Sequence, residues 1–419
     1  MILAFALSAH AAKLERVVED LLDDAALDGA SVGLVVTDAE GRERVAIDPQ
    51  RRLIPASTAK WVTAAAAAHE LGLDYRFETT VAATGWTEGD TLHGDLVVVG
   101  AGDLSLGDPD PQQVAADLAA LLRQLEVTRI EGDLVVDASH FDGPSHGPGW
   151  MWDDLGYAFS APYTAANVAH NLAVAGVACP AQNGPGSPLV DPPACLAALL
   201  LEGLPPAGVE VTGTAAVRAV PEAVPIGVLR SAPLRELLAR MLATSDNLYA
   251  ECIARALDRR PVADAAEARA RVDDVLQAAG IPRERLSLVD GSGLSRYSLA
   301  SAAAMVRLTR WADTQPWGPE LEALLPVAGQ QGTLAARMTA TPAEGHVRAK
   351  TGSMTGVRNL VGWVDTSGGP AAFAFLINGV AVPQQEVIAL QDRVMAVIAA
   401  SDGRRVKRKV AAALAEGSG

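Results

Sequence analysis

The chain has 419 residues, of which 49% are hydrophobic, so it can form about two or three domains with substantial cores. Aromatic residues account for only 4%, and the core must therefore consist mainly of Ala, Val and Leu. The formal net charge of −16 argues against nucleic acid as a principal partner, because a surface that binds nucleic acid needs positive charge.

The first eleven residues (MILAFALSAHA) form a short apolar run that ends in Ala-His-Ala, a pattern typical of a signal-peptide cleavage site. We interpret residues 1–11 as a signal segment and expect a periplasmic or secreted protein. A basic n-region is missing, and the alternative is an ordinary apolar N-terminus. Nowhere else does the sequence approach the ~20 apolar residues that a membrane-spanning helix requires.

The next part of the chain predicts a helix, a hairpin and a second helix. Residues 12–28 follow a helical apolar pattern, and residues 31–37 and 44–47 are predicted strands joined by a turn at 38–41. The alanine-rich stretch that follows predicts a buried helix beginning near Ser57, because Ala is the best helix former.

The composition changes between residues 81 and 227, where Gly, Pro and Asp become frequent. The sequence GDLVV occurs at 94–98 and again at 132–136, with a helical pattern over 111–125 between the two copies. Strand, helix and strand in this order predict a small α/β insert. We expect the stretch at 179–209, rich in Pro and Gly, to form loops at its edge.

Cys179 and Cys195 flank part of that stretch and can close a disulfide in an exported protein; the alternative is two unpaired small residues. Cys252 is predicted to be a buried thiol. The seven histidines show no spacing typical of a metal site, so we expect neither a metal nor an organic cofactor.

Beyond residue 228 the pattern of a globular core resumes. Helices are predicted at 233–243, 248–257, 299–313 and 384–399, and strands at 347–350, 360–364 and 372–377. With the hairpin at 31–47, these strands predict a mixed α/β fold whose antiparallel five-stranded sheet is flanked by helices. The predicted domains are a catalytic domain, residues 12–80 and 228–419, and an inserted domain, residues 81–227.

Ser57 and Lys60 form an S-x-x-K motif at the start of the alanine-rich helix. Residues at i and i+3 lie on one face of a helix, one turn apart. A serine hydroxyl needs a base to take its proton, and a lysine can serve where burial and nearby positive charge lower its pKa. The motif predicts Ser57 as nucleophile and Lys60 as base, although S-x-x-K alone occurs by chance in many proteins.

Ser245, Asp246 and Asn247 lie between two predicted helices. The Ser245 hydroxyl can relay a proton to a leaving amine, and the Asn247 amide can hold a substrate carbonyl or the base lysine. The alternative is a helix N-cap, because Ser, Asp and Asn are the preferred capping residues.

Lys350, Thr351, Gly352 and Ser353 end a predicted strand. The ammonium and the two hydroxyls can bind a terminal carboxylate through charge-assisted hydrogen bonds, and the glycine allows a substrate backbone to approach closely. Taken alone, the segment also fits an ordinary strand end with a turn.

Together, in this order, the three motifs are the set found in β-lactamases and penicillin-binding proteins. The interval between Ser57 and Ser245 is too long for a compact class A β-lactamase. The chain resembles the penicillin-binding protein 4 type of D-alanyl-D-alanine carboxypeptidase/endopeptidase, the S13 peptidases, a family that inserts domains between the first two motifs. The resemblance extends to DGSGLSR at 290–296, LPVAG at 325–329, GTL at 332–334 and KTGSMTGVRN at 350–359.

This resemblance implies that Ser57 attacks the carbonyl of the penultimate D-Ala of a peptidoglycan stem peptide while Lys60 accepts its proton. It assigns the proton relay and the hold on the substrate amide to Ser245 and Asn247. β-Lactam antibiotics are expected to acylate the same serine and to leave slowly.

The resemblance further implies that Lys350, Thr351 and Ser353 meet the terminal carboxylate of the substrate. The backbone N–H groups of Ser57 and Ser353 would form the oxyanion hole. Carboxypeptidase and endopeptidase action share this chemistry, and the sequence does not rank them.

The family also uses its insert to reach the diaminopimelate side chain of the stem peptide. The resemblance implies that Asp154 pairs with the ammonium of that side chain, that Arg296 pairs with its carboxylate, and that Phe159 lies in the same region. The alternative is a surface aspartate and a structural arginine. Thr355 stands where a longer polar residue is expected, and this departure weakens the expected grip on the substrate.

Two alternative functions and one further feature stay open. A β-lactamase would need a second base that positions water for fast deacylation, and the sequence shows no clear candidate for it. A non-catalytic peptidoglycan-binding module would not need the three intact motifs. A basic cluster at 404–409 fits a solvated tail, and the alternative is weak contact with an anionic membrane surface.

Overall fold

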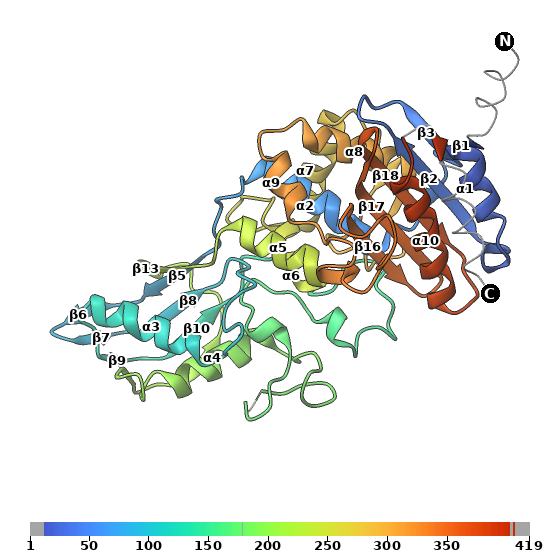
Figure 1. Ribbon diagram of the computed structural model, residues 1–419. Helices are drawn as coiled ribbons and strands as arrows, with labels where there is room; N and C mark the ends of the chain where they lie inside the picture. The colour runs from blue at the N-terminus through green and yellow to red at the C-terminus, as the bar shows by residue number, and fades with distance from the viewer. Residues whose placement is uncertain (1–11, 178, 403–404, 407–419) are drawn as a thin grey trace, which may run out of the picture. The chain divides into compact units, whose positions relative to one another are not determined.

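The computed structural model describes residues 12–177, 179–402 and 405–406 (Figure 1). The described residues divide into two compact units, the first within 1–69, 238–245 and 272–419 and the second within 70–237 and 246–271. The expected signal segment, and the side chains of the basic cluster near the C-terminus, lie outside the described residues. The domain boundaries predicted from the sequence stay a prediction.

The first unit is built on a five-stranded sheet with the strand order β16-β17-β18-β2-β3, and every neighbouring pair is antiparallel. The strands are β2 (Ser31–Thr37), β3 (Glu43–Ile47), β16 (Val347–Met354), β17 (Val357–Thr366) and β18 (Gly369–Asn378). This confirms the predicted antiparallel five-stranded sheet. The last three strands are longer than predicted, because tight turns join them; in the first turn Gly356 has a φ of +73°, which favours glycine.

Helices cover both faces of this sheet (Figure 1). Leu34 and Val36 on β2 pack into a core formed with α1 (Leu14–Leu22) and α10 (Gln384–Ala399). The intervening Val35 points to the other face, where α8 (Ala302–Asp313) lies. Since successive side chains of a strand point to opposite faces, a sheet covered on both sides needs the continuous apolar runs seen in its central strands.

The remaining elements of the first unit are short or surround the start of α2 (Ala59–Glu70). They are the 3-10 turns η1 (Ala25–Leu27), η2 (Ala56–Thr58) and η5 (Gly332–Leu334), the helix α9 (Gly318–Ala323), a small sheet of β4 (Arg52–Leu53), β14 (Leu286–Ser287) and β15 (Leu299–Ser301), and the pair β1 (Ala12–Lys13) and β19 (Arg405–Val406). The helix predicted over 12–28 is wrong in its second half. Asp24 caps a separate turn there, accepting a hydrogen bond from the Ala26 N–H at 2.9 Å.

The second unit contains a mixed five-stranded sheet in the order β12-β10-β8-β5-β13 and a four-stranded sheet in the order β11-β9-β7-β6. The strands are β5 (Glu78–Ala83), β6 (Trp86–Glu88), β7 (Thr91–His93), β8 (Leu96–Val99), β9 (Arg129–Glu131), β10 (Leu134–Asp137), β11 (Glu210–Val211), β12 (Ala215–Val217) and β13 (Val224–Arg230). The repeated GDLVV sequence forms the parallel neighbours β8 and β10, with α3 (Gln113–Gln124) between them in the chain. The predicted strand–helix–strand insert is confirmed.

One helix of the second unit lies where the sequence predicts loops. α4 (Pro192–Gly203) begins with two prolines, and Asp191 caps it by accepting a hydrogen bond from the Ala194 N–H at 3.1 Å. Proline is tolerated in a first helical turn, because the N–H that it lacks has no intrahelical acceptor there. The prolines therefore mark the start of a helix and not an extension of the loop.

A disulfide joins Cys179 to Cys195, with the two Cα atoms 5.3 Å apart. It ties Cys179 to the first turn of α4. The alternative of two unpaired cysteines is thereby excluded. Cys252 is a buried free thiol, as predicted. It lies on α6 (Asn247–Arg255); the neighbouring helices α5 (Leu234–Thr244) and α7 (Ala265–Ala278) each have residues in both units.

Candidate active site

Ser57 and Lys60 lie together at the beginning of the alanine-rich helix. Ser57 belongs to η2, Lys60 to the first turn of α2, and the Lys60 Nζ is 2.9 Å from the Ser57 Oγ. Lys60 is completely buried, whereas Ser57 is partly exposed. The Lys60 Nζ also donates to the carbonyl oxygen of Ser292 at 2.8 Å, which fixes the amine beside the hydroxyl.

Two asparagines from the central strands hold the turn that precedes Ser57. The side-chain N–H₂ of Asn359 donates to the carbonyls of Ile54 and Pro55 at 2.9 and 2.8 Å. The Ile54 N–H donates to the side chain of Asn378 at 2.7 Å. Because Asn359 is buried and its oxygen accepts from the Ile377 N–H at 2.9 Å, the turn is anchored directly to the sheet.

Two glycines allow other segments to approach the start of α2 closely. A Cβ on Gly352 of β16 would lie 2.7 Å from the Pro55 carbonyl oxygen, and a Cβ on Gly293 would lie 2.0 Å from the carbonyl oxygen of Ala56. Gly293 also has a φ of +76°. Any side chain at these two positions would push the K-T-G strand or the 290–296 loop away from Ser57.

The segment that carries Gly293 is organised by a buried carboxylate. Asp290 accepts hydrogen bonds from the N–H groups of Gly293 and Ser295 at 3.2 and 2.7 Å. The neighbouring Gly291 carbonyl accepts from the Thr63 hydroxyl at 2.6 Å on α2. This loop places the Ser292 carbonyl within hydrogen-bond distance of the Lys60 amine. Asp290 and Ser292 are not among the site residues predicted from the sequence, where the stretch carries only the family resemblance.

Lys350 and Ser245 form a second lysine–serine pair in the first unit. The Lys350 Nζ donates to the Ser245 Oγ and to the Thr351 carbonyl, each at 2.9 Å. Ser245 has a φ of +62°, a conformation that residues other than glycine rarely adopt. The Thr351 hydroxyl donates to the Thr333 hydroxyl at 2.9 Å, a contact that the sequence analysis does not predict.

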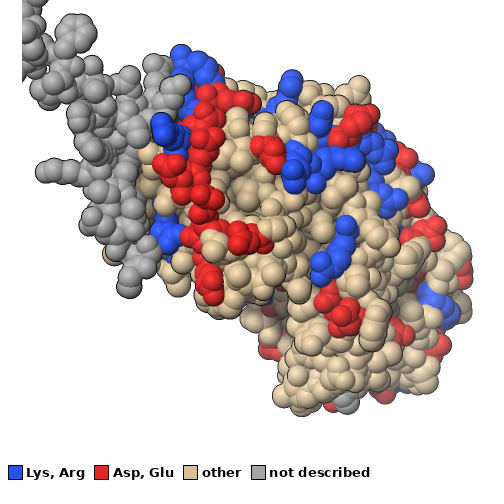
Figure 2. All heavy atoms as spheres, turned by 90° about the vertical axis from the view of Figure 1, so that its right-hand side faces the viewer, with Lys and Arg blue, Asp and Glu red and all other residues tan. Residues whose placement is uncertain are grey.

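Lys350 is completely buried, unlike the basic side chains that Figure 2 shows interspersed with acidic ones over one face of the molecule. Burial, and next the positive charge of Lys60, hold the pKa of Lys350 well below its ordinary value. A buried ammonium without a counter-ion is costly. An anionic group bound beside Lys350 would supply the missing charge.

Asn247 belongs to the second unit and begins α6. Its side-chain N–H₂ donates to the Phe159 carbonyl at 2.6 Å. Asp246 accepts a hydrogen bond from the Tyr249 N–H at 3.1 Å and so caps the same helix. The capping alternative therefore describes Asp246, while Asn247 joins the start of α6 to the segment that carries Phe159.

The other predicted substrate-binding residues are divided between the two units. In the first unit Ser353 is exposed and Arg296 is half-buried. In the second unit Asp154 is half-buried, and the exposed ring of Phe159 stacks on Tyr157 with centroids 5.4 Å apart. Trp152, seven residues before Phe159 in the chain, is also exposed, by 83%.

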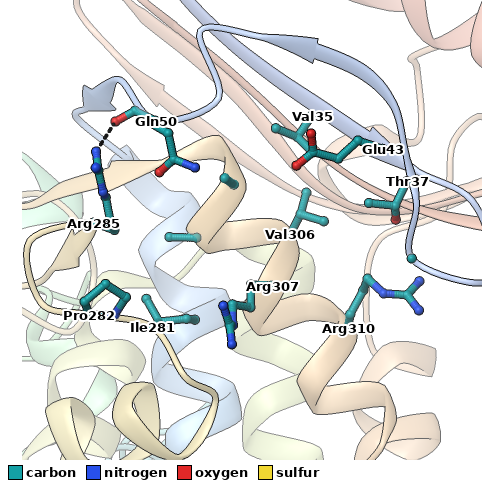
Figure 3. Close-up of a pocket in the computed structure, with 13 residues that line it drawn as sticks. Val35, Thr37, Glu43, Gln50, Ile281, Pro282, Arg285, Val306, Arg307 and Arg310 are labelled. Atoms are coloured by element: carbon teal, nitrogen blue, oxygen red, sulfur yellow. Dashed lines mark hydrogen bonds between the residues drawn. The ribbon is translucent and has the colours of Figure 1, made fainter.

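A cavity of about 540 Å³ in the first unit lies away from these motifs (Figure 3). None of the motif residues lines it. It is formed by α8, β2 and β3 with the segment at 281–285, and Arg285, Arg307 and Arg310 are part of its wall. Arg307 and Arg310 donate to the backbone carbonyls of Ala279, Asp38 and Ala39 and so tie surrounding loops to α8, and Arg285 donates to the carbonyl of Gln50.

Among the described residues, no group of three or more His, Cys, Asp and Glu side chains is placed to hold a metal ion. None of the helices in that part of the chain combines the length and the apolar character needed to cross a bilayer.

Comparisons with known proteins identify the family of this chain and the solved structures that share its fold. The family described as D-Ala-D-Ala carboxypeptidase 3 (S13) matches residues 14–195 and 186–401. The chain belongs to this S13 family. The family resemblance drawn from the motifs is thereby confirmed.

Relatives of this S13 chain match over most of their length. It is 33% identical to a D-alanyl-D-alanine carboxypeptidase of Actinomadura sp. (strain R39), over 97% of this chain and 89% of the relative. The crystal structure of penicillin binding protein 4 (dacB) from Haemophilus influenzae is similar with a TM-score of 0.79 and 26% identity, covering 88% of this chain and 94% of that one. The same protein complexed with a novel β-lactam gives a TM-score of 0.74 at 25% identity and the same coverage.

Proposed function

We propose that this chain is a serine-type D-Ala-D-Ala carboxypeptidase, DD-endopeptidase or both, and that it acts on peptidoglycan stem peptides through an acyl-enzyme on Ser57. The observation that carries the proposal is the pairing of the Ser57 hydroxyl with the buried Lys60 amine at 2.9 Å. Membership of the S13 family and the similarity to carboxypeptidases support it.

In the proposed reaction Lys60 acts as the base and takes the proton of Ser57 as the serine oxygen attacks the carbonyl of the penultimate D-Ala. The backbone N–H groups of Ser57 and Ser353 stabilise the tetrahedral oxyanion. Each such donor typically contributes about 3–4 kcal/mol to transition-state stabilisation. Collapse of this intermediate breaks the peptide bond, releases D-Ala and leaves an ester that water hydrolyses.

The second lysine–serine pair would serve the leaving group and the terminal carboxylate. Ser245 relays the proton to the departing amine, and Asn247 holds the substrate amide. Lys350, Thr351 and Ser353 bind the carboxylate, while Gly352 leaves room for the substrate backbone. The burial of Lys350, which lowers its pKa, supports this role, since a bound carboxylate restores the preference for its charged form.

We further propose that the third residue of the stem peptide is recognised by Asp154, Phe159 and Arg296. Asp154 would pair with an ammonium and Arg296 with a carboxylate of a diaminopimelate side chain. The exposed aromatic rings of Trp152 and Phe159 support contact with its aliphatic part. Thr355 remains a short side chain where a longer polar one is expected.

Three wider assignments accompany this proposal. The catalytic domain comprises residues 12–80 and 228–419, and residues 81–227 form its insert. Residues 1–11 act as a signal segment for export to the periplasm or outside the cell, and the basic cluster at 404–409 provides weak contact with an anionic membrane. The apolar run and small residues at 1–11 support export, and a disulfide in the described structure is typical of an oxidising compartment.

The central experiment is intact-mass measurement after exposure to benzylpenicillin, with release of D-Ala from a synthetic stem pentapeptide measured in parallel. The wild type is expected to gain one stable penicilloyl adduct and to release D-Ala, and Ser57→Ala is expected to do neither. Ser139→Ala, at an exposed serine of the second unit, is the matched control and should behave as wild type. D-Ala release by Ser57→Ala at the wild-type rate would refute the proposal. Rapid nitrocefin turnover without a lasting adduct would instead identify a β-lactamase.

A further inference from the structure

The side chain of His170, in the second unit, lies between two carboxylates. Its Nε2 is 2.8 Å from the Asp108 Oδ2, and its Nδ1 is 3.3 Å from the Asp246 Oδ2. The three side chains are 18%, 8% and 17% exposed, so water screens these contacts only partly. A neutral imidazole carries one N–H and can donate to only one of two carboxylates, whereas the imidazolium donates to both. Each of the two carboxylates therefore faces an N–H of His170 only when the ring is protonated.

The backbone around His170 adopts an unusual conformation. Ala169, His170 and Asn171 have φ values of +50°, +58° and +53°, so three consecutive residues other than glycine lie in the left-handed region. Each such residue typically costs about 1 kcal/mol or more. A conformation of this kind persists only where the surroundings impose it.

Buried amides impose that conformation. The Asn171 side chain accepts from the Val168 N–H at 3.0 Å and donates to the Pro162 carbonyl and to the Asn167 side chain, each at 2.7 Å. Asn167 in turn donates to the Cys252 Sγ on α6 at 3.4 Å. Asn171 and Asn167 are almost completely buried, so the left-handed turn that aims His170 is part of the packed interior of this unit.

The imidazole reaches the start of α6 by a third contact. Its ring stacks on Tyr249, with centroids 5.4 Å apart and an interplanar angle of 16°. The Tyr249 hydroxyl donates to the Asp108 Oδ2 at 3.2 Å, and the Tyr249 N–H donates to Asp246. Asp246 thus uses one oxygen to cap α6 and the other to meet His170, and the residue that follows it is Asn247.

We propose that His170, as its imidazolium, is a positioning residue that fixes Asp246 and thereby orients Asn247 at the beginning of α6. This inference rests on the proposed function, because Asn247 is assigned there to the substrate amide. His170 itself need not touch the substrate. Loss of its proton removes the positive charge from both contacts, and one of the two carboxylates then faces a nitrogen lone pair of His170 instead of an N–H. The S-D-N segment would therefore be less well ordered at alkaline pH than at neutral pH.

The test uses His170→Asn, because asparagine tolerates a positive φ and the change therefore removes the imidazole with the least backbone strain. The second-order rate of acylation by benzylpenicillin should fall about 10- to 100-fold, while the melting temperature changes little. Asp108→Asn, which weakens the same contact from its other side without altering the S-D-N segment, should lower the rate in the same direction. His93→Asn is the matched control, since His93 of this unit contacts Glu88 and Glu131 instead.

Two readouts separate positioning from a merely structural role. In ¹⁵N-histidine NMR spectra, assigned with His170→Asn, the His170 ring should be protonated on both nitrogens at pH 7. The protection factors of the amides at residues 247–250, which correct for the intrinsic rise of exchange with pH, should be lower in His170→Asn than in the wild type. In the wild type they should fall as the ring loses its proton. A singly protonated ring at pH 7, or a wild-type acylation rate in His170→Asn, would overturn the inference. If the wild type itself formed no adduct, the proposed function would fail, and unchanged exchange at 247–250 would still separately refute the positioning role.

Discussion

Lys350 donates to the Ser245 hydroxyl at 2.9 Å although 105 residues separate the two in the chain. Ser57 and Lys60, by contrast, are brought to the same distance by one turn of helix. Burial, and next the charge of Lys60, depress the pKa of Lys350. This relationship leads to the first prediction.

The KM for a peptide ending in D-Ala-D-Ala should begin to rise at a pH well below 10.5, the value near which an ordinary lysine loses its proton. A depressed pKa means that folded Lys350 becomes neutral at lower pH than an exposed lysine, and the neutral amine binds a carboxylate poorly. The slope should approach tenfold per pH unit above that pKa, as for loss of one proton. Steady-state kinetics of D-Ala release across pH values measure it.

Lys350→Ala provides the control for this pH dependence. It should raise KM by about 30-fold or more, the typical cost of about 2 kcal/mol or more for truncating a buried hydrogen-bonded charge pair. Its KM should then show no such slope. The same slope in the variant would assign the pH dependence to another group.

Gly352→Ala should slow acylation by benzylpenicillin about 100-fold, because the new Cβ would lie 2.7 Å from the Pro55 carbonyl oxygen and displace β16 from η2. Gly33→Ala is the matched control on the same sheet. Its Cβ would meet the tip of the Leu53 side chain at 3.3 Å, which can give way, so its acylation rate should stay near that of the wild type. Stopped-flow or quenched mass measurements give both rates, and equal rates would contradict the proposed close packing.

Asp258→Asn should lower the melting temperature at pH 7 by about 3 °C or more, as expected for loss of a buried charge-assisted network. Asp258 accepts from the Arg260 side chain and from the Asp264 N–H at 2.7 Å, and these bonds, led by Arg260, lower its pKa to about 2. Since the folded pKa lies below the unfolded one, this stabilisation is present above pH ~4 and is lost as pH falls through about 2.

Thermal unfolding of both proteins between pH 7 and pH 3 checks this sign. The difference in melting temperature should shrink toward pH 3. Asp20→Asn, at an exposed position of α1, should leave the melting temperature unchanged throughout. A difference for Asp258→Asn that stays constant with pH would rule out the carboxylate network as its cause.

Replacing both Cys179 and Cys195 by Ser should destabilise the second unit by about 3 kcal/mol, the typical contribution of a disulfide that closes a loop of this length. The bond spans 16 residues and anchors α4. Limited proteolysis around residues 179–195 should become faster, because the open loop samples more conformations. Acylation of Ser57, in the other unit, should stay near the wild-type rate. Equal proteolysis of the two proteins under non-reducing conditions would contradict the prediction.

Much of this protein could be predicted from the sequence by itself. Alternating and continuous apolar runs located the strands of the main sheet and the helix at 384–399, since those patterns are local consequences of burial. Spacing alone placed Ser57 and Lys60 one turn apart. The order of the three motifs pointed to the S13 family before any contact was known.

Other features were decided only by the tertiary structure. The Lys350–Ser245 bond, the anchoring of the Ser57 turn by Asn359, and the approach of Gly293 depend on segments that are remote in the chain, and no local pattern specifies how such segments pack. The loops predicted in place of α4 follow from its prolines, because a proline breaks a helix when it lies inside the helix. At the start of a helix, where these prolines lie, it does not. His170 carried no signal at all, because its surroundings come from residues 108, 246 and 249, and its left-handed backbone is imposed by buried amides that become neighbours only in the folded unit.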